Sequence, residues 1–227
     1  MDKNNEIKKL IETFHSEYTR NGEPIRINFR EIVYELNSTE RYSHLIHSYP
    51  AKLLCHIPYF FLQTDYFCPI NGVVLDPFCG TGTVMLEANI SGRNAKGADA
   101  NPLACLISRV KTTYIKKEDL QKTLGTIISR AKRFNTNGAL DTPSISRWFS
   151  KSTIMQLWHL ECAIKKVRDT KHQEFFMMCL SNLVKKVSFA DPSISVPVKL
   201  NPERFAQNPE RMESARFKLK TLENVDV

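Results

Sequence analysis

The sequence lacks several features that define familiar protein classes. Its six cysteines include no C-x-x-C pair, so neither a zinc site nor a disulfide framework is indicated. Its six histidines show no metal-ligand spacing, and we expect no metal site. No apolar run is long enough to span a bilayer, and the charged start MDKNNEIKKLIETF is unlike a secretory signal. We therefore expect a cytoplasmic protein.

Positive charge is present in excess. The 227 residues include 32 Lys and Arg against 24 Asp and Glu, which gives a net charge of +8. Such an excess favours a polyanionic partner, most often nucleic acid. Basic positions that could follow a phosphate backbone are the lysine pairs 116–117, 165–166 and 185–186, with Arg147, Arg168 and Lys199. The alternative is that these residues form ordinary solvated helix faces.

The middle of the chain predicts one βαβ unit of a parallel sheet. Its expected parts, in order, are a strand at 72–76 (GVVLD), a tight loop around Gly80 and Gly82, a helix at 83–91, a strand at 94–99 (NAKGAD) and a helix at 103–112. Further helices are expected at 3–20, from about 29, from Pro50 to about 62, and at 119–134, 152–167, 172–187 and 209–222. Residues 188–205 are rich in proline and are expected to be extended.

The loop after the first strand has the composition of a ligand site. Side chains at Gly80 and Gly82 would prevent a ligand from approaching the backbone closely. Asp99 lies 23 positions after Asp76, near the spacing of about 20 residues between a nucleotide loop and its ribose-binding acid. The segment DPFCGTGT has neither the lysine of a P-loop nor the pyrophosphate fingerprint. It therefore favours a nucleoside ligand without phosphates.

This segment resembles the S-adenosylmethionine loop of DNA methyltransferases that modify adenine N6 or cytosine N4. The resemblance rests on HSYPAKL (47–53), LDPFCGTGT (75–83) and GADANPLA (97–104). Residues 185–200 (KKVSFADPSISVPVKL) resemble an inter-motif segment of the subset whose T-S-P-P-Y motif comes late in the chain. The alternative is that DPFCGTGT is merely a strand-turn-helix connection.

The resemblance implies an α/β fold, with a partial Rossmann-like methyltransferase sheet, a helical lobe and a partner chain that completes the sheet. The domains expected are an N-terminal helical segment (1–46), an S-adenosylmethionine-binding βαβ core (47–115) and a helical lobe with a Pro-rich loop (116–227). By analogy, Asp76, Phe78, Gly80 and Gly82 would line the methionine and sulfonium side. Asp99 would bind the ribose. The complete expected cofactor site is His47, Pro50, Lys52, Asp76, Pro77, Phe78, Cys79, Gly80, Thr81, Gly82, Thr83, Asp99, Ala100, Asn101 and Pro102.

The resemblance also reveals a missing motif. The family uses a [D/N/S]-P-P-[Y/F/W] loop to hold the target amino group and stack on the flipped base, but this sequence contains no P-P pair. No catalytic residue is therefore assigned, and Cys79 is interpreted as a small packing residue. Three explanations remain: a split enzyme completed by a second subunit with the S-P-P-Y motif, a fragment, or a pseudo-enzyme. We favour the first.

The leading hypothesis is therefore the cofactor-binding subunit or half of a site-specific DNA methyltransferase from a restriction-modification system. Its partners would be double-stranded DNA and the S-P-P-Y subunit. The late position expected for the missing motif favours cytosine N4 over adenine N6 as the target. The alternatives are a relative of the tRNA guanine-N2 methyltransferases, which use a similar loop, and a non-catalytic protein that binds cofactor or DNA.

Overall fold

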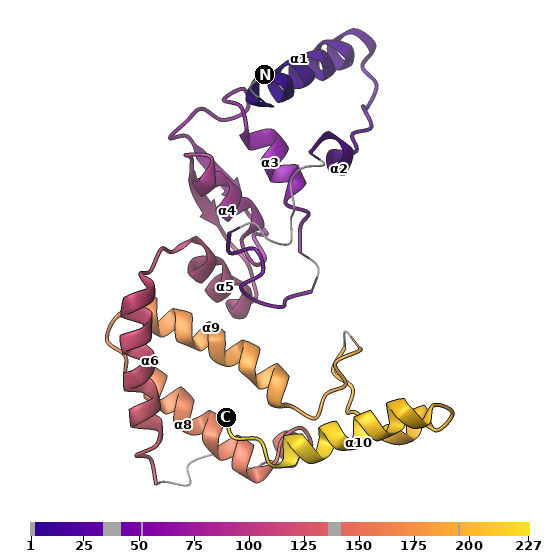
Figure 1. Ribbon diagram of the computed structural model, residues 1–227. Helices are drawn as coiled ribbons and strands as arrows, with labels where there is room; N and C mark the ends of the chain where they lie inside the picture. Colours follow the sequence, from indigo (N-terminus) through magenta and orange to yellow (C-terminus); the bar gives the residue numbers. More distant parts are fainter. Residues whose placement is uncertain (1–2, 34–41, 51, 136–141, 195) are drawn as a thin grey trace. The chain divides into compact units, whose positions relative to one another are not determined.

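The computed structural model describes residues 3–33, 42–50, 52–135, 142–194 and 196–227 (Figure 1). They form two compact units, Met1–Thr113 and Tyr114–Val227. Each unit has a hydrophobic core of its own. None of the described helices is long and apolar enough to cross a membrane.

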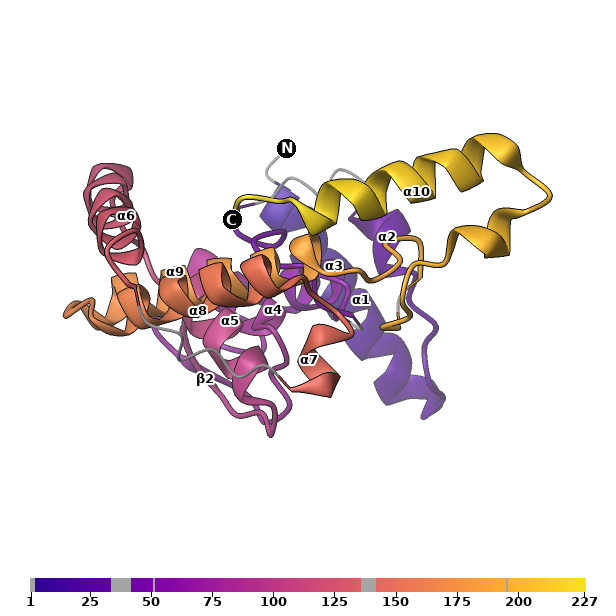
Figure 2. The same cartoon turned by 90° about the horizontal axis from the view of Figure 1, so that it is seen from below.

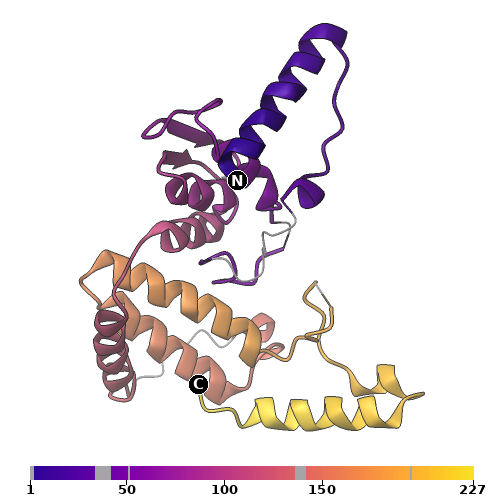
Figure 3. The same cartoon turned by 45° about the horizontal axis from the view of Figure 1, so that its top comes forward.

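Three helices at the start of the first unit share one core (Figure 3). Ile7 and Ile11 lie four residues apart on the buried face of the first helix and contact Val33 and Phe60. The rings of Phe60 and Phe61 meet edge to face, with centroids 5.3 Å apart. The helices are α1 (Lys3–Asn21), α2 (Phe29–Ile32) and α3 (His56–Leu62).

The expected βαβ unit is confirmed. Strands β1 (Val73–Asp76) and β2 (Asn94–Gly97) pair in parallel, with Val73 opposite Asn94 and Asp76 opposite Gly97. Helix α4 (Thr83–Ile90) connects the strands and contacts both, and α5 (Pro102–Thr112) follows β2 and packs on α4. Strand β1 ends directly before Pro77, whose nitrogen cannot donate to a sheet.

One edge and one face of β1 are open. The Gly72 and Asp76 carbonyls accept hydrogen bonds from Asn94 and Ala98 of the β2 side. Because backbone groups alternate along a strand, those of Val73 and Leu75 point to the opposite edge. Among the described residues β1 pairs with β2 alone, and the side chains of Val73 and Leu75 are 58% and 69% exposed. Within the described residues, the sheet thus has an open, apolar edge.

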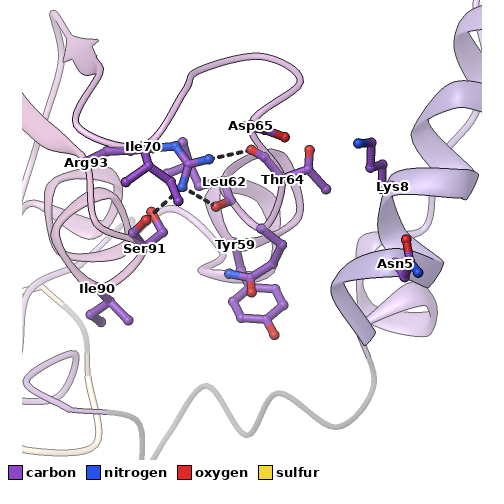
Figure 4. A pocket seen from close by; sticks show the side chains of 11 residues that line it. Asn5, Lys8, Tyr59, Leu62, Thr64, Asp65, Ile70, Ile90, Ser91 and Arg93 are labelled. Carbon is purple, nitrogen blue, oxygen red and sulfur yellow. Dashed lines mark hydrogen bonds between the residues drawn. The ribbon is translucent and has the colours of Figure 1, made fainter. Parts of the chain in front are cut away.

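Arg93 connects the ends of α3 and α4 (Figure 4). Its buried guanidinium donates hydrogen bonds to the carbonyls of Leu62 at the end of α3 and Ser91 after α4, both at 2.8 Å. It also donates to the carbonyls of Thr64 and Cys68. A single side chain therefore satisfies four acceptors between α3 and β2.

The second unit is helical (Figure 2). Its core lies among α6, α8 and α9, which contribute Ile127, Ala131, Ala163, Ile164 and Phe176. After α9, the chain forms an isolated antiparallel bridge between Ala190 and Lys199. The elements are α6 (Lys117–Ala131), α7 (Pro143–Ser146), α8 (Lys151–Lys165), α9 (Thr170–Val187), the 3₁₀ turn η1 (Pro202–Phe205) and α10 (Pro209–Glu223).

Two expected elements were wrong. The helix expected from Pro50 begins only at His56, because Pro58 would break the interior of a longer helix but is tolerated in the first turn of α3. The expected extended segment ends in the 3₁₀ turn η1, whose start is capped by the Asn201 side chain and opens with Pro202.

We expect Arg93→Met to lower the free energy of unfolding by about 3 kcal/mol, because it leaves four carbonyls, two of them in buried hydrogen bonds, without this donor. Urea unfolding followed by circular dichroism measures the change. Arg30→Met on the exposed surface of α2 is the matched control and should change it by less than about 0.5 kcal/mol. Equal effects of the two substitutions would contradict this role for Arg93.

Candidate functional site

Hydrogen bonds within the loop between β1 and α4 fix its conformation. The Asp76 carboxylate accepts a hydrogen bond from the Phe78 N–H at 3.1 Å, and the Gly82 N–H donates to the Cys79 carbonyl at 2.7 Å. Gly80 and Gly82 both have left-handed backbones, with φ of +49° and +76°. Glycine adopts this conformation without the penalty that other residues suffer. These contacts therefore give the loop a defined shape.

The end of β2 fixes this loop from the side. One oxygen of the Asp99 carboxylate accepts from the Gly80 N–H at 2.9 Å, and the other accepts from the Asn101 N–H at 2.8 Å. The Cys79 N–H donates to the Ala98 carbonyl, also at 2.9 Å. The carboxylate that the spacing singles out is thus in direct contact with the glycine loop.

The upstream segment joins the same place through a residue that sequence reasoning missed. The Asn101 side-chain amide donates to the Tyr49 hydroxyl at 2.9 Å, and the Asn101 oxygen caps α5 by accepting from the Leu103 N–H. The Lys52 ammonium donates to the carbonyls of His44 and His47 and closes the turn that precedes Tyr49. Tyr49 lies inside the H-x-Y-P-A-K segment, so the signal was present in the sequence.

The two loop glycines have different surroundings. A Cβ on Gly82 would lie 2.3 Å from the Ser108 Oγ and 3.0 Å from its Cα, so Gly82 is required for packing against α5. A Cβ on Gly80 would meet nothing within 4 Å. Only Gly80 therefore leaves space on the side from which a ligand can approach.

The predicted site residues divide by exposure. Phe78 is 87% exposed, and Asp76, Gly80 and Asp99 are half-buried. Those that offer exposed surface are Pro50, Pro77, Phe78, Ala100, Asn101 and Pro102. Those that are buried are His47, Cys79, Thr81, Gly82 and Thr83, and Lys52 is intermediate. The exposed and half-buried residues can contact a ligand, whereas the buried loop residues Cys79, Thr81, Gly82 and Thr83 support the loop.

Cys79 has the properties of a packing residue. Its side chain is buried, and its Sγ approaches the Gly80 carbonyl at 3.8 Å. Burial, followed by the nearby Cys105, Asp76 and Asp99, raises the pKa of the Cys79 thiol. A thiol with a raised pKa is a poor nucleophile at neutral pH. The arrangement therefore gives Cys79 no activation for covalent chemistry.

A buried polar cluster that the sequence did not predict lies behind the loop. The His44 Nε2 and the Glu87 carboxylate are 2.8 Å apart and both are buried. The Lys111 ammonium, on a side chain that is 4% exposed, donates to the Thr81 hydroxyl at 3.4 Å. Burial, and secondarily the charge of Lys52, lowers the pKa of Lys111 to about 8. In sequence, Lys111 is indistinguishable from an ordinary cation in the last turn of a helix.

We expect the free energy of unfolding to rise between about pH 8 and pH 10.5 because of Lys111. In this range the unfolded chain holds a proton that the folded chain has lost, so higher pH favours folding, by up to about 3 kcal/mol. Lys111→Met should abolish this part of the rise and be more stable than the wild type at pH 7. Urea unfolding at several pH values measures this pH dependence. Lys96→Met, on exposed β2, is the control. The assignment would be contradicted if the free energies of unfolding of Lys111→Met and the wild type differed by the same amount at every pH.

The segment that contains this site is similar to known proteins. Residues 15–109 match the family model for the N6/N4 methyltransferases, described as DNA methylase. The chain is 27% identical over 161 residues to type II methyltransferase M.MvaI of Kocuria varians, which covers 66% of this chain and 36% of M.MvaI. It is 31% identical over 104 residues to type II methyltransferase M.MjaII of Methanocaldococcus jannaschii, which covers 45% of this chain and 19% of M.MjaII.

The chain thus spans about a third or less of the length of these curated relatives. No solved structure matches it. The matched segment contains both strands, the glycine loop, Tyr49 and Asp99. Through this segment, the chain is similar to the DNA methylases of the N6/N4 class.

Proposed function

We propose that the first unit binds S-adenosylmethionine and that the chain provides the cofactor-binding half of a site-specific DNA methyltransferase. The observation that supports this most directly is the contact between the Gly80 N–H and the Asp99 carboxylate. It brings the glycine loop and the expected ribose-binding acid to one place, next to the Asn101–Tyr49 contact. All three segments that resemble the family therefore meet at one site.

The residues present suit this cofactor. A carboxylate offers about four lone-pair positions, and Asp99 uses two of them for the Gly80 and Asn101 N–H groups. The remaining positions can accept hydrogen bonds from two ribose hydroxyls. Gly80 leaves the space for a close approach. Asp76 and Asp99 give the loop a negative potential, which favours a cationic sulfonium over a phosphate.

The expected contacts follow from this placement. Asp99 would bind the ribose, and Asn101 and Pro102 would border the adenine, with Tyr49 holding Asn101 in position. Phe78 would lie along the methionine side, and His47, Pro50 and Lys52 would close the opposite side. When bound, the cofactor supplies an electrophilic methyl group. The residues of this site would orient that group and restrict water.

We further propose that another polypeptide, such as a partner subunit, supplies the S-P-P-Y loop. The open edge and exposed face of β1, formed by Val73 and Leu75, provide room for another parallel strand. Such a strand would end beside the Asp76–Gly80 loop, because the carboxyl ends of parallel strands meet at one edge of a sheet. Its following loop would hold an exocyclic amino group of duplex DNA, and we favour cytosine N4 over adenine N6.

Calorimetric titration with S-adenosylmethionine tests the cofactor site. We expect the wild type to bind and Asp99→Ala to bind about 100-fold more weakly, since it loses two charged hydrogen bonds worth about 3 kcal/mol together. Asp65→Ala removes an exposed acid of the same unit and should bind like the wild type. Adding a chain with the S-P-P-Y half should give methylation of DNA. Absence of cofactor binding both with and without that half would refute the proposal.

The two loop glycines should separate binding from stability. Gly80→Ala should cost about 1 kcal/mol of stability because of its left-handed backbone, yet remove cofactor binding by filling the open space. Gly82→Ala should cost about 3 kcal/mol, because its methyl group collides with Ser108. Thermal melts and calorimetry on both variants measure this. Unchanged cofactor affinity in Gly80→Ala would remove Gly80 from the site.

A further inference from the structure

The net charge of the chain belongs to one of its two units. Residues 114–227 contain 20 Lys and Arg against 12 Asp and Glu, whereas residues 1–113 contain 12 of each. The second unit therefore carries the whole excess of +8, and the unit with the glycine loop is neutral. A basic excess confined to one compact unit indicates where a polyanion is attracted.

The second unit has a cavity of about 340 Å³ beside α10. Its base is apolar and includes Leu200 and Phe205. Arg211, Ser214, Ala215 and Lys218 also line it, at positions i, i+3, i+4 and i+7 of α10, so they form one helix face. Asp191, Pro192 and Ser193 border the cavity from the loop after α9.

The face of α10 has a cation at each end and small residues between them. Arg211 and Lys218 are separated by two helical turns, about 10 Å along the axis. Within the described part of the chain, neither forms an ion pair. Ser214 is exposed between the two cations and lets a polymer backbone approach the helix closely, whereas the Ala215 side chain is buried. This spacing suits a chain of phosphates better than a single compact anion.

The one carboxylate that lines the cavity, Asp191, is already hydrogen-bonded and lies near a cation. Asp191 is 4% exposed and accepts hydrogen bonds from the Ser193 N–H at 2.9 Å and the Ser193 hydroxyl at 2.6 Å. The Arg204 guanidinium lies 4.0 Å from its other oxygen. These hydrogen bonds first, and then the charges of Arg204 and Lys218, hold the pKa of Asp191 below its usual range. The charge of Asp191 therefore acts on Arg204 and Lys218 and does not cancel the charge of Arg211.

We propose that this cavity and the 211–218 face of α10 bind the sugar–phosphate backbone of duplex DNA. The choice of DNA rests on the proposed function, whereas the location rests on the charge distribution and the cavity. Arg211 and Lys218 contact phosphates, and Ser214 donates its hydroxyl to the backbone between them. Such contacts position the duplex and do not read its sequence.

Fluorescence anisotropy of the full chain with a labelled duplex, at several salt concentrations, tests this inference. The variant is Arg211→Gln/Lys218→Gln, and the matched control is Lys8→Gln/Lys9→Gln, which removes two exposed charges from α1 of the neutral unit. We expect the first variant to bind at least about tenfold more weakly at low salt and to reduce the slope of log K against log salt by about two. The control should keep the wild-type slope.

Two further measurements exclude trivial causes. Arg211→Lys/Lys218→Arg keeps both charges and should retain the salt slope, so a loss caused by misfolding is distinguishable. Titration with S-adenosylmethionine should be the same for all variants, because the cofactor site lies in the first unit.

Each remaining outcome is decisive. Equal losses in variant and control would show that net charge alone matters, which overturns the location. A wild-type chain that binds S-adenosylmethionine but no duplex would overturn the inference and leave the cofactor proposal intact. Tighter binding of structured tRNA than of duplex DNA at matched salt would overturn the choice of DNA.

Discussion

The hydrogen bond between the Gly80 N–H and the Asp99 carboxylate is the constraint on which the first unit depends. Each of the two strands has only four residues, and an isolated pair of this length has little stability of its own. The link joins the end of β2 to the loop after β1, and Asn101 extends it to Tyr49. The site is therefore built from contacts that also complete the fold.

The first unit also buries polar groups, and their burial opposes folding. Lys111, Arg93 and the His44–Glu87 pair are polar groups removed from water, which is unfavourable unless they are well paired. Arg93 is paired by four carbonyls, whereas Lys111 has a single long contact with Thr81 and a lowered pKa.

The sequence predicts this site where local pattern and chemistry agree. The strands, α4 and the Asp99 position follow from apolar runs, glycines and spacing, all of which act over a few residues. What it does not predict depends on distant partners. Gly82 is a glycine because of Ser108 on α5, and Lys111 is buried because α5 packs on α4. The late start of α3 was readable from Pro58, whose place in a first turn outweighs the apolar stripe.

The division of charge between the two units follows from opposite electrostatic demands. A cationic sulfonium is favoured by the carboxylates Asp76 and Asp99, and those carboxylates repel phosphates. A unit with no net charge and an anionic loop cannot by itself concentrate DNA near that loop. Attraction of the duplex must then come from elsewhere, and within this chain only the second unit has the required excess of Lys and Arg. In the proposed arrangement, binding a cation and binding a polyanion are compatible in one chain because separate units would perform them.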